Sequence, residues 1–183
     1  MSLVKEKVQS AFDTLKEAFG YDNPFAAPRV QKIVVSSGTG RRAKTDREWN
    51  DLVADRLAQI TGQKPAIRGA KQSIAGFKIR QGDPVGHVVT LRGARMYSFL
   101  DKLIHVALPR TKDFRGLKRS SIDEMGNMTL GIKEHTIFPE ASDEELRNIF
   151  GMSISIITTA GSREEALPFF EHLGMPLQKE EAK

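Results

Sequence analysis

Six basic side chains and no carboxylate lie between Arg56 and Gly82, in a chain that is otherwise well supplied with acids. The six are Arg56, Lys64, Arg68, Lys71, Lys78 and Arg80. A run of basic residues is most often an ordinary solvated face, but cations without neighbouring acids also neutralise phosphate groups. The absence of acids over the whole stretch therefore favours a surface that binds a polyanion.

Phe77 stands among Lys71, Lys78 and Arg80, so an aromatic ring is surrounded by cations. Such a ring can stack on a base or a ribose while the cations contact phosphates. The same ring could instead anchor a loop to the hydrophobic core. The residue types alone leave both interpretations open.

The charge of the chain is unevenly distributed. The net charge is +5 over 183 residues, but residues 29–119 carry a balance of +13 and residues 120–183 a balance of −7. Cysteine is absent, which excludes a disulfide framework and a thiolate metal site and fits a reducing compartment. We find no signal-peptide run and no apolar stretch of membrane-spanning length, so we expect a soluble cytoplasmic protein.

The segment Gly38–Ala43 follows a predicted strand and matches the G-x-G-x-x-A pattern of dinucleotide-binding proteins. In that pattern a glycine turn places a pyrophosphate at the N-terminus of a helix. Here the helix signal begins only at Thr45, and the next candidate strand, residues 65–68, lacks an acid to hold the ribose. We favour a glycine turn that lets the backbone approach a nucleic acid, with a nucleotide-dependent enzyme as the alternative.

Other catalytic or metal-binding arrangements are not indicated. The histidines are far apart, and none stands at metal-ligand spacing with another: His87, His105, His135 and His172. The serines match no nucleophile motif. The acids around Ser142 are typical of a helix start, where carboxylates favour the helix dipole. We predict no catalytic residue, no metal site and no cofactor.

Two helices are predicted in the first third of the chain. The first ends at Gly20 and has apolar residues at helical spacing: Val4, Val8, Phe12, Leu15 and Phe19. The second starts at a capping box formed by Thr45 and Glu48 and ends at Gly62. Its apolar stripe consists of Trp49, Leu52, Val53, Leu57 and Ile60.

Two further helices follow. One covers residues 94–108 and stops before Pro109. Its inward residues are Met96, Phe99, Leu100, Leu103 and Ala107. The last starts at a capping box of Ser162 and Glu165 and contains Pro168, which predicts a bend or a late start.

Strands are predicted at residues 29–36, 85–92, 127–132 and 153–159. Glycine and proline punctuate residues 62–86, which indicates hairpins around a mobile loop. Together these elements predict an α+β fold, with helices on one face of a mainly antiparallel sheet and a protruding basic, glycine-rich loop. We expect one domain, residues 1–177, and a flexible tail, residues 178–183.

Several long motifs resemble the bacterial-type family of large-subunit ribosomal protein L five. They are ITGQKP (60–65), SIAGFKIRQGDPVG (73–86), VTLRGARM (89–96), ALPRTKDFRGL (107–117), GNMTLGIKE (126–134), IFPE (137–140) and ISIITTA (154–160). PRVQKIVV (28–35) with GTG (38–40) fits the family's first strand and turn. The order and spacing match from residue 3 to residue 177, nearly the whole chain.

The resemblance implies a non-catalytic protein that binds 5S rRNA and helps to dock it, with 23S rRNA, in the central protuberance. The loop 74–82 would reach the tRNA in the P site. Carried over by position, the 5S-facing residues would be Lys32, Ser36, Gln63, Thr90 and Arg92. The tRNA contacts would be Ile74, Phe77, Lys78 and Arg80.

The resemblance also implies an intersubunit bridge to the small-subunit head protein S thirteen. Its side of the bridge would use residues 110–117, with Arg110, Asp113 and Arg115, and the segment 140–148. Neighbouring large-subunit proteins are further expected partners, whereas no membrane and no DNA is expected. A free-standing RNA-binding protein outside the ribosome is the alternative.

This chain departs from the family pattern at several positions. Ser36 stands where asparagine is usual, and a hydroxyl keeps a donor and an acceptor but has less reach. Arg41 and Arg42 replace residues that are often acidic or small, which we expect to strengthen phosphate binding locally. The usual D-G-R-G-N turn reads D-E-M-G-N at residues 123–127, without its basic contact.

Overall fold

The computed structural model describes residues 2–40, 42, 46–142 and 145–178. The chain divides into two compact units. Unit 1 comprises residues 1–33, 91–130 and 155–183, and unit 2 comprises residues 34–90 and 131–154. Among the described residues, no helix is long and apolar enough to cross a membrane. That residues 1–177 act as a single domain stays a prediction.

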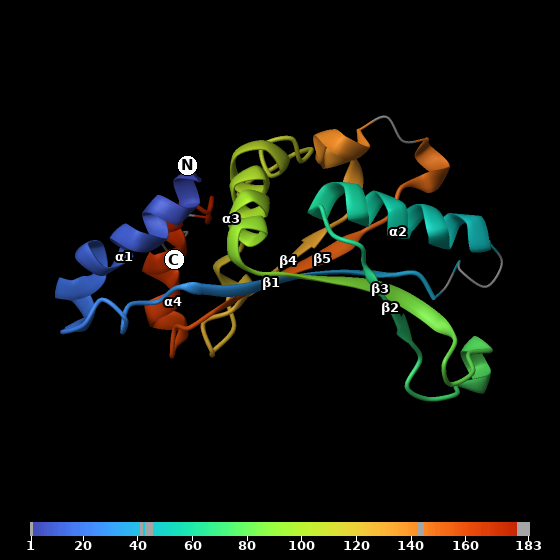
Figure 1. The fold of residues 1–183 in the computed structure, drawn as a ribbon, viewed down its shortest axis with the longest axis horizontal. Helices are drawn as coiled ribbons and strands as arrows, with labels where there is room; N and C mark the ends of the chain where they lie inside the picture. Colours follow the sequence, from blue (N-terminus) through green and yellow to red (C-terminus); the bar gives the residue numbers. More distant parts are fainter. Residues whose placement is uncertain (1, 41, 43–45, 143–144, 179–183) are drawn as a thin grey trace. The chain divides into compact units, whose positions relative to one another are not determined.

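Five strands form a sheet in the order β2-β3-β1-β5-β4 (Figure 1). They are β1 (Val30–Gly38), β2 (Ala66–Gly69), β3 (Pro84–Leu91), β4 (Met128–Ile132) and β5 (Met152–Thr158). β2 pairs antiparallel with β3, and Arg68 lies opposite Gly86. The end of β1 meets the start of β3, where the Thr39 N–H donates to the Val85 carbonyl at 2.9 Å. The predicted α+β fold with an antiparallel sheet is confirmed.

Unit 1 contains three helices, α1 (Leu3–Phe19), α3 (Gly93–Lys102) and α4 (Arg163–Leu173), and α1 packs against both of the others. Asp101 accepts the N–H of Val4 at the start of α1 at 2.9 Å. The Lys7 ammonium donates to the Leu173 carbonyl at the end of α4 at 3.3 Å. A carboxylate at a helix N-terminus and a cation at a C-terminus both favour the helix dipole.

The buried face of α1 differs from the predicted stripe. Val4, Ala11 and Leu15 are buried, whereas Phe19 is 38% exposed and stacks on Tyr21 at 5.9 Å between ring centroids. Phe12 is only half-buried. The small side chain of Ala11 permits close packing that the pattern of large apolar residues does not reveal.

The predicted helix 94–108 is present, and its five predicted inward residues are buried. Its last turn is a π-helix, Leu103–Ala107, in which the Leu108 N–H donates to the Leu103 carbonyl at 2.9 Å. This wide turn stands directly before Pro109, which cannot donate a further helical bond. α4 starts at Arg163, capped by the Ser162 hydroxyl at 3.3 Å from the Glu165 nitrogen, so Pro168 does not delay its start.

Unit 2 has one α-helix among its described residues, α2 (Arg47–Thr61), which ends at Gly62 in the left-handed conformation. The helix cap is Asp46, whose carboxylate accepts the Trp49 N–H at 2.9 Å, whereas the predicted cap, Thr45, lies outside the described residues. Trp49, Val53, Leu57 and Ile60 are buried as predicted, and Leu52 is half-buried. Figure 1 shows α2 along one face of the strands of unit 2.

The helix start that we predicted around Ser142 is not an α-helix. Pro139–Ala141 and Leu146–Asn148 each form a single 3-10 turn, and Asp143 and Glu144 lie outside the described residues. The Ser142 hydroxyl donates to the Pro139 carbonyl at 3.1 Å instead of capping a following helix. Serine side chains that bond the nearby backbone stabilise turns as well as helix caps, which explains the misassignment.

Candidate nucleic-acid interface

Burial alternates along the parts of β1 and β3 that belong to unit 2, so these strands have a covered face and an open face. The open face carries the half-buried residues Val34, Ser36, Val88 and Thr90. In Figure 1 the described part of unit 2 has no helix on this face. Side chains here are small or hydroxylic and none is acidic, so a polyanion can approach the strands closely.

Gln63 lies beside Thr90, although 27 residues separate them in sequence. The left-handed Gly62 ends α2 and turns the chain, and the Thr61 hydroxyl bonds the Leu57 and Gln63 carbonyls at 2.6 and 3.1 Å. The Gln63 amide nitrogen then donates to the Thr90 carbonyl at 3.3 Å. Within the described residues the Thr90 hydroxyl has no hydrogen-bond partner, so it can serve a ligand.

The five predicted 5S-facing residues fall in both units. Ser36, Gln63 and Thr90 belong to unit 2, whereas Lys32 and Arg92 belong to unit 1. Lys32 shares the less buried face of β1 with Ser36, and Arg92 is exposed directly after β3, at the start of α3. The two strands are neighbours in the sheet. Residues far apart in the sequence therefore contribute to adjacent strands.

Residues 70–83 connect β2 to β3 and have local structure of their own. Ile74 and Ile79 exchange backbone hydrogen bonds at 2.8 and 3.1 Å, around a 3-10 turn at Ala75–Phe77. Lys78 closes the turn in the left-handed conformation, with φ of 53°. Figure 1 shows this turn beyond the ends of the β2–β3 hairpin. The mobility expected of the loop stays a prediction.

Phe77 in this turn is 72% exposed, and Ile74 is 46% exposed. A side chain that anchors a loop to the hydrophobic core would be buried, so the structure rules out this interpretation of Phe77. Five cations of the acid-free stretch are also largely accessible: Lys64, Arg68, Lys71, Lys78 and Arg80. None of the five forms an ion pair within the part of the chain that the structure describes. Arg56 instead bonds Gln59 on α2 at 3.0 Å.

The Gly38–Ala43 segment does not have the geometry of a dinucleotide site. The Thr39 and Gly40 N–H groups both donate to the Val85 carbonyl, at 2.9 and 3.0 Å, so they are not available to a pyrophosphate. Thr39 is also buried. Arg41 and Ala43 lie outside the described residues. Arg42 contacts Trp49 and Asp46, and phosphate binding by its side chain stays a prediction.

The predicted bridge residues lie on two segments, one in each unit. In unit 1, Arg110, Asp113 and Arg115 are exposed, and Asp113 adopts a left-handed conformation with φ of 54°. The end of this segment is fixed where the Leu117 N–H donates to the Pro176 carbonyl at 2.7 Å. In unit 2, the exposed side chains of Glu145 and Arg147 form an ion pair.

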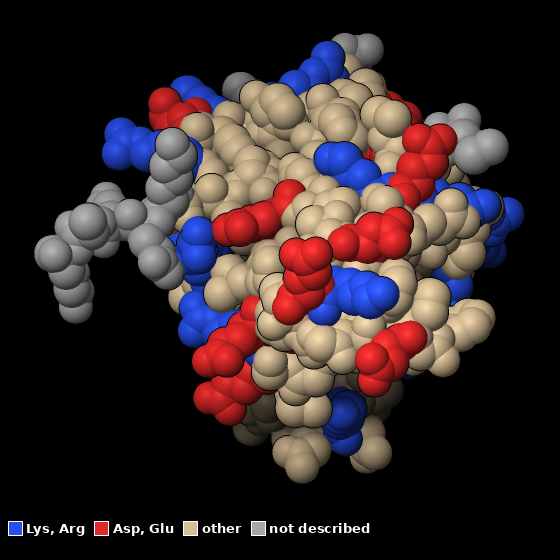
Figure 2. Space-filling view, turned by 90° about the vertical axis from the view of Figure 1, so that its left-hand side faces the viewer, with Lys and Arg blue, Asp and Glu red and all other residues tan. Residues whose placement is uncertain are grey.

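The end of unit 1 that carries α1 and α4 has a different charge. Figure 2 shows acidic and basic side chains interspersed over this face. Exposed acids on the two helices include Glu6, Asp13, Glu17, Glu164 and Glu171. A face of mixed charge attracts phosphate less than the acid-free hairpin does.

Two titratable side chains have shifted pKa values. Burial lowers the pKa of His87, and its bond to Asn50 and the nearby Asp51 only partly oppose this. Burial and the hydrogen bond that Tyr21 donates to Glu165 raise the pKa of the Tyr21 hydroxyl. Neither residue lies on the open face. Among the described residues we find no group of His, Asp and Glu that could hold a metal ion.

One residue on a less buried strand face was not singled out from the sequence. It is Ser153 on β5, which is half-buried between buried neighbours. The apolar residues Met152 and Ile154 on either side of Ser153 form the alternating pattern of a strand, which would have placed Ser153 on the opposite face. The role of Arg42 had no sequence signal, because its partners lie on separate segments.

Comparison with known proteins identifies the family of the chain. Residues 23–80 match the family described as ribosomal protein L5, and residues 84–177 match the model of the C-terminus of that ribosomal family. The large ribosomal subunit protein uL5 of Rubrobacter xylanophilus is 50% identical over 97% of this chain and 99% of its own length. The protein of the same name from Thermoanaerobacter sp. is 48% identical over 98% of this chain and 100% of its own length.

The exposed cations and the open sheet face have the residue types that suit contact with a polyanion. The chain belongs to the ribosomal protein L5 family. It is therefore a structural ribosomal protein and not an enzyme, and the resemblance noted in its motifs is confirmed.

Proposed function

We propose that this structural protein of the large ribosomal subunit, which works in the cytoplasm, binds 5S rRNA through the open face of its sheet. The observation that carries the proposal is the hydrogen bond from Gln63 to the Thr90 carbonyl on the open face of unit 2, with Ser36 on the neighbouring strand β1. Lys32 and Arg92, which belong to unit 1, are included because of the family resemblance. Hydroxyl, amide and cationic groups on a flat surface suit the phosphates and 2′-hydroxyls of an RNA backbone. Contacts with 23S rRNA and a place in the central protuberance follow from the same family.

We further propose that the turn 74–82 contacts the tRNA in the P site. Its exposed Phe77 can stack on a base or a ribose, while Lys78 and Arg80 reach phosphates. The local hydrogen bonds between Ile74 and Ile79 fix the turn before binding, which lowers the entropy that binding must overcome. Such contacts would hold tRNA without reading much of its sequence.

The third part of the proposal concerns the small subunit. The segments 110–117 and 140–148 would contribute to a bridge with the head protein S thirteen. Both segments carry side chains of both signs, such as Arg115 and Asp113 or Arg147 and Glu145. Such pairs favour an orientation-specific contact with a charged protein.

Binding of purified 5S rRNA, measured by filter titration, tests the central proposal. Alanine at Lys32, Gln63 or Thr90 should each weaken binding by about 1–2 kcal/mol, the scale of a hydrogen bond that involves a charged or buried partner. Lys5→Ala and Thr14→Ala are matched controls, because both residues are exposed on α1, on the face of mixed charge. Equal losses in the controls and the test variants would refute the assignment of the open face.

A further inference from the structure

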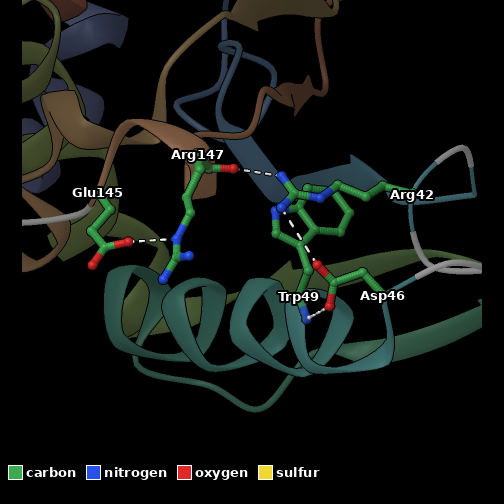
Figure 3. Close-up of polar contacts among 5 residues, drawn as sticks. All are labelled: Arg42, Asp46, Trp49, Glu145 and Arg147. Atoms are coloured by element: carbon green, nitrogen blue, oxygen red, sulfur yellow. Dashed lines mark hydrogen bonds and ion pairs between the residues drawn. The ribbon is translucent and has the colours of Figure 1, made fainter.

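Four residues of unit 2 connect three parts of the chain (Figure 3). Arg42 lies in the turn after β1, Asp46 and Trp49 stand at the start of α2, and Arg147 belongs to the 3-10 turn Leu146–Asn148. The backbone of Arg42 is itself held, since its N–H donates to the Thr39 carbonyl at 3.0 Å. Its carbonyl accepts the Asp46 N–H at 3.1 Å.

The guanidinium of Arg42 makes three kinds of contact at once. Its carbon lies 4.9 Å from the centre of the Trp49 ring, and its Nη2 lies 3.4 Å from the Asp46 carboxylate. Its Nη1 donates to the backbone carbonyl of Arg147. Figure 3 shows the guanidinium against the indole ring, with one edge turned to Asp46 and another to Arg147.

The platform beneath Arg42 is rigid. Trp49 is 8% exposed, and its backbone N–H is bonded to the same Asp46 that pairs with Arg42. Asp46 thus caps α2 with one oxygen and holds the guanidinium with the other. The position of Arg42 is therefore set by the first turn of α2, whose tryptophan is buried in the core of unit 2.

We infer that Arg42 is a positioning residue that fixes the backbone of residues 145–148 to the start of α2. The side chains of Arg147 and Glu145 are 76% and 64% exposed, so the segment holds its ion pair towards solvent while its backbone is held from behind. This segment is part of the bridge side, so the inference rests on the proposed function.

Lysine could not replace Arg42 here. A planar guanidinium can stack on an indole and still direct separate N–H groups to a carboxylate and a carbonyl. An ammonium group is a point charge without a flat face, so a lysine would keep only some of these contacts. Arg42→Lys is therefore a graded variant that keeps the charge and weakens the geometry.

Amide hydrogen exchange tests the inference in the intact protein. The Asn148 N–H donates to the Glu145 carbonyl at 2.8 Å and reports on the segment, while the Gly62 N–H at the far end of α2 serves as reference. In Arg42→Ala, Asn148 should exchange about tenfold faster, which equals about 1.4 kcal/mol and the loss of one hydrogen bond from a charged group. Gly62 should be unchanged.

Arg56→Ala is the matched control, because it removes another arginine of unit 2, one that lies on α2 and contacts Gln59 and Asp55. It should leave Asn148 unaffected, and Arg42→Lys should give an intermediate rate. Asn148 exchange that is unchanged in Arg42→Ala, or equal in the two alanine variants, would overturn the inference. If Arg42→Ala were globally destabilised, the Arg42→Lys result would decide in the same way.

Fluorescence gives an independent measurement, because Trp49 is the only tryptophan of the sequence. Removal of the guanidinium uncovers the ring, so acrylamide should quench Trp49 more strongly in Arg42→Ala than in the unaltered protein or in Arg56→Ala. Equal quenching in all three would contradict the contact. Association of reconstituted subunits separates the two proposals: faster Asn148 exchange with normal association supports the positioning role and contradicts the bridge role of the segment.

Discussion

Gly86 on β3 provides a sharp test of the packing in unit 2. A Cβ added at this position would lie 2.9 Å from the backbone carbonyl oxygen of Ser37 on β1, about 0.5 Å closer than ordinary contact. The obstacle is backbone and not a flexible side chain, so the two strands must separate. Overpacking of this kind costs about 1–3 kcal/mol. Alanine also lowers the conformational entropy of the unfolded chain, which offsets about 0.4–1 kcal/mol of this destabilisation.

Gly86→Ala should therefore destabilise the protein by about 1–2 kcal/mol. Gly131→Ala on β4 is the matched control in the same unit, because a Cβ there meets nothing within 4 Å and its φ is not in the left-handed region. This control should be neutral or stabilise by up to about 1 kcal/mol. Urea unfolding measures the difference, which at a slope of about 2 kcal/mol per molar corresponds to roughly 1 M in midpoint.

The result that would refute this reasoning is equal stability of the two variants, since it would mean that β1 and β3 separate without cost. A second consequence concerns the open face, because Ser36 and Thr90 lie on the same two strands. If the strands separate in Gly86→Ala, the affinity for 5S rRNA should fall below that of Gly131→Ala at temperatures where both are folded.

Four further predictions concern other parts of the molecule. The pKa of buried His87 lies below its ordinary value of 6.5, so the unfolded chain binds the proton more readily than the folded protein. The free energy of unfolding should therefore fall as the pH drops below 6.5. His87→Gln should reduce this pH dependence, measured by urea unfolding at about pH 5–8. Gly126→Ala should lower stability by about 2 kcal/mol or more, because its φ is +76° and a Cβ would lie 2.7 Å from that of Ala160; a melting curve like that of Gly131→Ala would contradict this. Phe77→Ala should weaken binding of tRNA to reconstituted subunits by about 1–3 kcal/mol without changing stability, whereas a loss of stability would indicate a buried anchor. The logarithm of the binding constant for 5S rRNA should fall linearly with the logarithm of the salt concentration, and a flat response would exclude a phosphate-dominated interface.

Local signals in the sequence predicted most of the elements. Glycines such as Gly20 and Gly62 mark helix ends because they adopt the left-handed conformation without steric cost. The stripe of α2 and the inward residues of α3 follow from 3.6-residue periodicity, which burial against one core enforces. Strand alternation in turn places Ser36 and Thr90 on the half-buried side.

The errors occurred where short-range bonds compete. Asp46 caps α2 in the structure, and a sequence offering Thr45 and Asp46 in succession does not decide between them. The region around Ser142 has the composition of a helix start, yet it forms separate 3-10 turns. The partners of Arg42 could not be predicted either, because they depend on how the chain, 105 positions further on, returns Arg147 to the turn after β1.

The interleaved composition of the two units affects the order in which the chain can fold. β1, β3, β4 and β5 each begin in one unit and end in the other, so neither unit is a continuous stretch of sequence. α1 is made early, but its partner α4 is among the last elements to leave the ribosome, roughly 10–30 s later at about 5–20 residues per second. The part of α1 that packs against α4 stays uncovered during that time. Newly made chains should therefore need protection from aggregation until synthesis is nearly complete.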